Sequence, residues 1–154
     1  MSLKSLVNYI SQSQVTKELI ARIKKNGEIN IVGSSRYAKA LIINSIASLE
    51  HKNIFLICSN IEIAYKWYGY FESIENNNVL YYPPNENLPY EKTNKSSEVE
   101  YSQLNIISNL MNEQKINNLI NIIITTERAL QPHLLNKNFF KNTNINLKKG
   151  EIIE

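Results

Sequence analysis

The chain has 154 residues, of which 43% are hydrophobic and 20% are charged, and its formal net charge is +3. This length suits one domain with a sizeable core, and the composition excludes a chain that is disordered along most of its length. The charge is too small to indicate nucleic-acid or membrane binding by itself. A single cysteine, Cys58, cannot form an internal disulfide, so we expect a reduced, cytoplasmic protein in which Cys58 is a small buried residue.

Residues 1–27 are expected to form two short amphipathic helices. Apolar residues recur at helical spacing in both halves of this region, and Gly27 can end the second helix. The first residues have no long apolar core, so we expect no signal peptide, and no apolar run approaches the length of a membrane span.

Residues 29–49, INIVGSSRYAKALIINSIASL, have the outline of a strand, a phosphate-type loop and a helix. We expect a strand over 28–32 and a helix over 36–50, with an apolar face made by Ala38, Leu41, Ile42, Ser45, Ile46 and Leu49. A working P-loop requires G-x-x-x-x-G-K-[ST], because backbone amides and a Lys hold phosphate and the hydroxyl binds Mg²⁺.

This loop keeps the first glycine and the lysine of that motif, Gly33 and Lys39. It has Ala38 in place of the second glycine and Ala40 in place of the hydroxyl residue, so we interpret it as a degenerate Walker A loop. Lys39 is then expected to be a solvated helix residue, and Arg36 to form a surface ion pair rather than an anion site.

Strands and helices are expected to alternate along the rest of the chain. Strands are expected over 54–58, 79–82, 121–125 and 145–147, and helices over 61–73 and 97–111, with a short helix from 126 to 130. This order predicts a three-layer α/β domain with a parallel sheet. The turns at 33–37, 59–60, 83–89 and 125–128 should meet at the edge where the strands end.

Other candidate sites in the sequence have structural interpretations. The aromatic stripe that includes Trp67 and Phe71 is expected to be core rather than a base-stacking surface. His51 and His133 have no partners at ligand spacing, so we expect no metal site. Glu127 is a lone carboxylate after an apolar strand, which does not make a Walker B pair, and a helix start is its expected role.

The most specific motif is YYPPNENLPYE at residues 81–91. It resembles the F-P-x-W-E-x-L-P-Y-E stretch of the bacterial transcription-repair coupling factor (Mfd) family. The matching residues are Tyr82, Pro83, Glu86, Leu88, Pro89, Tyr90 and Glu91, with Tyr82 in place of the family's Phe and Asn85 in place of its Trp. The family also has a G-x-S-x-x-A-x-A-L remnant at the P-loop position, which Gly33, Ser35, Ala38, Ala40 and Leu41 match.

The resemblance implies the N-terminal, UvrB-like region of that family, with a P-loop-NTPase-like, helicase-like fold. Residues 28–140 would be the UvrB-like α/β domain, and residues 141–154 the truncated start of the following subdomain. The whole family protein displaces stalled RNA polymerase by ATP-driven DNA translocation and recruits UvrA for nucleotide excision repair. ATP, Mg²⁺, DNA and RNA polymerase would bind other domains, and UvrA the following subdomain.

The segment itself would then be a non-catalytic scaffold without a cofactor, packed against neighbouring domains of the same chain. The alternative is a small nucleotide-binding P-loop protein, an enzyme or a switch. A weaker third possibility is DNA contact through the loop-bearing edge of the sheet. For a fragment, residues 139–153 should be poorly ordered or pack on a neighbouring molecule.

Overall fold

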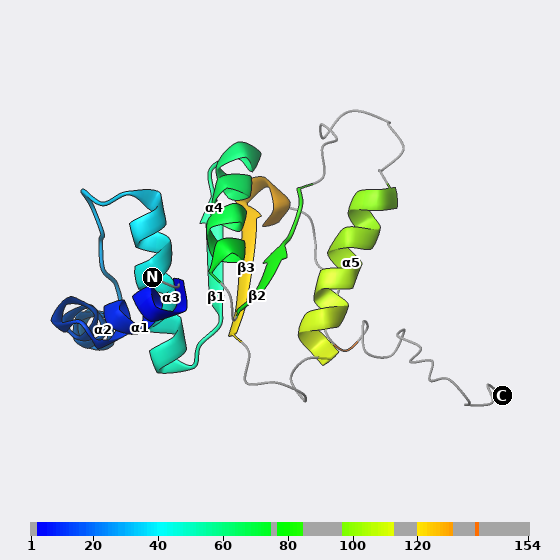
Figure 1. Cartoon of the computed structure of the whole chain (residues 1–154). Helices are drawn as coiled ribbons and strands as arrows, with labels where there is room; N and C mark the ends of the chain where they lie inside the picture. Colours follow the sequence, from blue (N-terminus) through cyan, green and yellow to red (C-terminus); the bar gives the residue numbers. More distant parts are fainter. Residues whose placement is uncertain (1–2, 75–76, 85–96, 113–119, 131–137, 139–154) are drawn as a thin grey trace.

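The structure is a computed structural model that describes residues 3–74, 77–84, 97–112, 120–130 and 138 (Figure 1). This part of the chain is an α/β protein with one three-stranded sheet. Its helices are α1 (Leu3–Gln12), α2 (Gln14–Asn26), α3 (Arg36–Glu50), α4 (Ile61–Ser73) and α5 (Ser97–Asn112). Its strands are β1 (Ile54–Cys58), β2 (Asn77–Tyr81) and β3 (Ile120–Thr126), and a 3₁₀ turn, η2 (Glu127–Leu130), follows β3.

The sheet has the order β1-β3-β2, and both pairings are parallel. Ile122 lies opposite Ile54 of β1 and Val79 of β2, so β3 is the central strand. Asparagines join the three strands near their beginnings: Asn53 Oδ1 accepts from the Asn121 amide at 3.0 Å, and Asn78 Nδ2 donates to Asn121 Oδ1 at 2.9 Å. The expected strands over 54–58, 79–82 and 121–125 are therefore confirmed, with bounds shifted by one or two residues in the last two.

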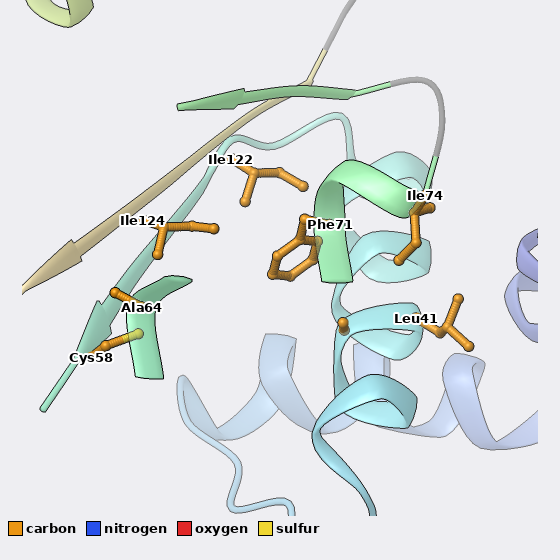
Figure 2. Packing of buried hydrophobic residues seen from close by; sticks show 8 residues of the cluster. Leu41, Cys58, Ala64, Phe71, Ile74, Ile122 and Ile124 are labelled. Carbon is orange, nitrogen blue, oxygen red and sulfur yellow. The ribbon is translucent and has the colours of Figure 1, made fainter. Parts of the chain in front are cut away.

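Helices cover the two faces of the sheet. Alternate residues of a strand point to opposite faces. Ile122 and Ile124 belong to the larger core with Phe71 of α4, which Figure 2 shows at close range. Ile123 packs instead against a second core that contains Ile106 of α5. The layers are thus α4, with α3 beside it, on one face and α5 on the other, as the alternation of elements predicts.

The first two helices meet at a sharp corner that polar groups hold together. Ser13 Oγ accepts from the Thr16 amide at 3.2 Å, which caps α2, and the buried hydroxyl of Thr16 donates to the Ile10 carbonyl at 2.7 Å. Gly27 ends α2 at φ 78°, a left-handed conformation that glycine adopts without strain, and its N–H donates to the Ile23 carbonyl. The helices expected within residues 1–27 and the glycine stop are confirmed.

The strand expected over 28–32 is wrong: these residues form no strand pairing in the structure. Ile29 and Ile31 still alternate with exposed neighbours, but they are half buried against α2 and α3 instead of a neighbouring strand. Val32 is 77% exposed. An alternating pattern reports which side of an extended chain is buried, whereas strand formation also requires a hydrogen-bonding neighbour.

The apolar face expected for α3 is also partly wrong. Leu41 and Ser45 are buried as expected, whereas Leu49 is exposed and the buried set includes Ala40, Asn44 and Ala47. The reason is that α3 packs against both α1 and α4, so its small residues are covered from two sides. Ser45 Oγ fits there because it donates to the Leu41 carbonyl at 2.8 Å within its own helix.

Several expected features lie outside the described residues. These are Glu86, Leu88, Pro89, Tyr90 and Glu91 of the family motif, the strand over 145–147, His133, and the tail over 139–153.

Candidate functional site

The degenerate loop forms the exposed turn that leads into α3. Residues 32–36 are exposed, and Gly33 has φ 77° with open space where a Cβ would be. A P-loop normally begins directly at the carboxyl end of a sheet strand. Here the preceding residues 28–32 are not part of the sheet, so the 33–37 turn does not follow a sheet strand. The turn still lies near the 59–60 turn, because the charge of Arg36 acts on Glu62 at the amino end of α4.

The first amides of α3 already have partners within the protein. Ser35 caps the helix: its Oγ accepts from the Ala38 amide at 3.2 Å, and its carbonyl accepts from the Lys39 amide at 3.0 Å. In a phosphate-binding loop, amides at this position point at the ligand and remain available to it. A phosphate at this helix end would therefore have to displace the Ser35 cap.

Ala40 occupies the position where a P-loop has its Mg²⁺-binding hydroxyl, and it is 0% exposed. It lies in the larger core with Leu41 and Phe71, so its side chain faces packed apolar groups rather than the turn. Ala38 and Lys39 are half buried. A hydroxyl at position 40 would enter the core, where a polar group without a partner costs about 1–3 kcal/mol.

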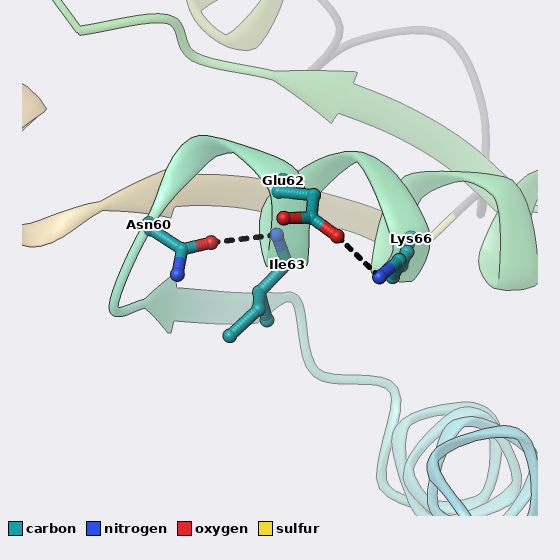
Figure 3. Close-up of polar contacts among 4 residues, drawn as sticks. All are labelled: Asn60, Glu62, Ile63 and Lys66. Carbon is teal, nitrogen blue, oxygen red and sulfur yellow. Dashed lines mark hydrogen bonds and ion pairs between the residues drawn. The ribbon is translucent and has the colours of Figure 1, made fainter.

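The amino end of α4 is capped in the same way, and it carries a negative charge (Figure 3). Asn60 Oδ1 accepts from the Ile63 amide at 2.8 Å. The Lys66 ammonium pairs with the Glu62 carboxylate one turn away, and this bond together with the nearby charge of Arg36 lowers the pKa of Glu62. A carboxylate at this helix end repels a second anion, and the Arg36 charge acts on this carboxylate. Whether Arg36 binds an anion stays a prediction.

The carboxyl ends of the strands hold the buried polar groups that sequence reasoning missed. Thr125 Oγ1 donates to the Tyr82 carbonyl at 3.1 Å, and Gln103 Nε2 of α5 donates to the Pro83 carbonyl at 2.7 Å. These bonds fix the backbone of Tyr82 and Pro83, the first two residues of the family motif. Thr126 Oγ1 is buried and has no hydrogen-bond partner in the described part of the chain. In the sequence, the only sign of these buried polar groups is the pair Thr125 and Thr126 directly after an apolar run.

Cys58 ends β1 on the face that α4 covers. It is buried, as expected, and burial raises the pKa of its thiol. A buried, protonated thiol is a weak nucleophile, so Cys58 belongs to the core.

The aromatic stripe of α4 is confirmed as core. Phe71 is fully buried, and the rings of Trp67 and Phe71 stack with centroids 5.9 Å apart. Trp67 also meets Tyr70 edge to face, which in turn contacts Tyr37 of α3 in the same manner. These ring contacts join α4 to α3 and leave no row of parallel exposed faces for bases among the rings they connect.

Metal-binding residues do not gather in the portion that the structure describes. There, no group of three or more His, Cys, Asp or Glu side chains is close enough to hold an ion. His51 ends α3 at φ 50°, and Glu127 begins η2, the helix-start role expected for it.

An apolar hollow was not expected from the sequence. It has a volume of about 290 Å³ and lies between α2, α3, residues 29–31 and the beginning of β1. Its walls are mainly aliphatic: Ile23, Ile29, Ile31, Ile43, Ile46, Ala47 and Ile54. Glu50, Lys52 and Asn53 form its polar part.

Comparisons with models of known protein families and with curated proteins give no match to this chain. Within the described residues, the helices are too short or too polar to cross a bilayer.

Proposed function

We propose that this chain is a non-catalytic scaffold domain with a helicase-like, P-loop-derived fold and a nucleotide site that has lost its function. We further propose that it is the N-terminal, UvrB-like region of a cytoplasmic transcription-repair coupling factor. Its role is then to hold neighbouring domains of that protein, which displaces stalled RNA polymerase and recruits UvrA. The parallel α/β sheet is compatible with this fold, and the resemblance around Tyr82 and Pro83 motivates the family.

The observation that carries the scaffold proposal is the state of the α3 amino end. Ser35 occupies the amides of Ala38 and Lys39, and Ala40 faces the core. Of the three contributions that a P-loop makes to phosphate and Mg²⁺, the amides of Ala38 and Lys39 are used internally and the hydroxyl is absent, whereas the Lys39 side chain is present.

Calorimetric titration with ATP and Mg²⁺ tests the scaffold against its alternative, a small nucleotide-binding P-loop protein. The scaffold predicts no saturable heat. Binding tighter than about 100 μM, which corresponds to roughly −5.5 kcal/mol, would favour the nucleotide-binding protein instead. A Lys39→Ala variant is the control, because any specific phosphate binding should depend on that ammonium, whereas non-specific heat should not.

The family assignment has its own test in the organism that carries the gene. Deleting the gene should remove the faster repair of transcribed DNA strands relative to non-transcribed strands after ultraviolet damage. Strand-specific repair that stays unchanged in the deletion strain would overturn the coupling-factor proposal and would leave the calorimetric result unaffected.

A further inference from the structure

The outer edge of β1 has no strand partner in the part of the chain that the structure describes. Among the described strands, β1 pairs only with β3, so the backbone groups on its other edge have no strand partner. The strand reads IFLIC and contains no charged residue or proline, the two features that usually protect an edge strand from pairing with another chain.

The apolar hollow adjoins the amino end of this edge. Ile54 and Asn53 line it from the β1 side, and Ile29 and Ile31 line it from the other side. Figure 1 shows residues 28–32 on the side of β1 that is away from β3, with α3 between them and β1 in this view. The hollow is therefore bordered by two extended stretches of chain, and neither of them pairs there with another described strand.

The apolar surface continues around the edge onto the other face of the sheet. Phe55 lies opposite Ile123 and Ile57 opposite Thr125, so both side chains point to the α5 face. Each is 53% exposed, because α5 covers the β2 and β3 side of that face. The unpaired edge of β1 thus has apolar side chains on both faces of the sheet, Ile54 beside the hollow and Phe55 and Ile57 on the α5 face.

We infer that the open edge of β1 binds an extended polypeptide segment, which adds to the sheet as a further strand and fills the hollow. Only a peptide backbone can satisfy the unpaired N–H and C=O groups in register, and alternate side chains would reach both faces at once. A small apolar ligand in the hollow would leave Phe55 and Ile57 exposed. The added strand continues the ladder that β3 already makes with β1.

The charges around the hollow specify the partner further. Glu50 is paired with Lys24 at 2.9 Å, whereas Lys52 is exposed and makes no ion pair with a described residue. Among the described residues, the amino end of the β1 edge therefore has a positive charge without an ionic partner. The partner segment has apolar residues at alternating positions on both faces and a carboxylate at the end that lies next to Lys52. This inference does not depend on the function proposed above.

The experiment uses the whole chain and a short, end-blocked peptide with alternating Val, Thr and Ile and an Asp at each end. Amide hydrogen exchange is followed by NMR with and without the peptide at up to millimolar concentration. The outward amides of β1 should exchange at least about tenfold more slowly with peptide, a change of about 1.4 kcal/mol in opening free energy. The same peptide with Lys at both ends should protect them less.

Two variants with matched changes localise the effect. Phe55→Lys puts a charge on the edge strand and should abolish the protection. Tyr101→Lys, at an exposed aromatic residue of α5, should leave it intact. Circular dichroism confirms that both variants are folded. Unchanged exchange in the original chain, or protection that survives Phe55→Lys, would overturn the inference. Self-association through this edge, seen by sedimentation equilibrium and lost in Phe55→Lys, would assign the site to a second copy instead.

Discussion

β1 and β3 are neighbours in one sheet and each contains a run of apolar residues, yet their surroundings differ. β3 is covered on both faces, with Ile124 fully buried against α4 and Ile123 packed against α5. Within the described residues, β1 is covered only on the α4 face, where Cys58 is buried, and Ile57 on its other face is half exposed. The difference comes from position, since β3 is central and β1 is at the edge.

Because of this difference, the apolar residues of the two strands have different roles: some stabilise the fold, and others can contact another polypeptide. Residues of β3 hold the fold together, because each is in contact with helices or neighbouring strands. The outward residues of β1 contribute little to stability and remain available for contacts with another polypeptide. The following predictions test that separation, first within the sheet and then at the helix ends beside it.

The largest expected effect comes from truncating the same residue type in the two strands. Ile124→Ala leaves a cavity in the closed core and should lower the free energy of unfolding by about 2–5 kcal/mol. Ile57→Ala removes a half-exposed side chain and should cost about 1 kcal/mol or less. Urea unfolding followed by circular dichroism measures both. Equal losses in the two variants would mean that the α5 face of β1 is covered in solution.

The adjacent threonines of β3 should respond in opposite ways to the same substitution. Thr125→Val removes the buried hydrogen bond to the Tyr82 carbonyl and should destabilise the chain by about 1–3 kcal/mol. Thr126→Val removes a buried hydroxyl that has no partner among the described residues, so stability should be unchanged or slightly higher. Thermal unfolding of the two variants decides this, and a clear loss for Thr126→Val would reveal a partner for that hydroxyl.

The caps of α3 and α4, Ser35 and Asn60, should contribute about equally to the free energy of unfolding. Ser35→Ala and Asn60→Ala each remove a side chain that accepts from a backbone amide, and each should cost about 1 kcal/mol of stability. Replacement by glycine should cost only a few tenths of a kcal/mol. If Ser35→Ala were neutral in urea unfolding, the Ala38 amide would not be occupied by Ser35 in solution.

The smallest effect at neutral pH concerns Cys58. Burial raises the pKa of its thiol above the ordinary value of 9.0, so the unfolded chain loses this proton at a lower pH than the folded chain. Stability should therefore be independent of this group below that value and should decrease as the pH rises above it, by at most about 1.4 kcal/mol per pH unit.

Cys58→Ala should flatten the decrease between about pH 9 and about pH 10. Above about pH 10 the tyrosines with raised pKa values, Tyr68 and Tyr82, contribute in the same direction. A profile that the substitution leaves unchanged would show that the thiol titrates alike in both states.

Sequence reasoning located the elements well where a pattern is local. The unbroken run Ile54–Cys58, the aromatic stripe of α4 and the glycine stop at Gly27 are each determined by neighbours a few residues away. The sequence also shows that positions 38 and 40 lack the second glycine and the hydroxyl of a P-loop, and the interpretation of this loop as a degenerate Walker A stays a prediction.

The sequence could not show which contacts form between distant segments. Residues 28–32 alternate like a strand, but their pairing depends on whether another strand comes beside them, and Ile29 and Ile31 pack on helices instead. The buried side of α3 likewise depends on α1 and α4 together. The bond between Thr125 and Tyr82 joins residues 43 positions apart, and no local pattern predicts it.

The central claim is that the α3 amino end no longer binds phosphate, and the amides of Ala38 and Lys39 report on it directly. Their NMR chemical shifts should stay unchanged when ATP and Mg²⁺ are added to millimolar concentration, because Ser35 already occupies both groups. Saturable shifts of these two amides with a midpoint below about 100 μM would contradict the claim and would show a working nucleotide site at this helix.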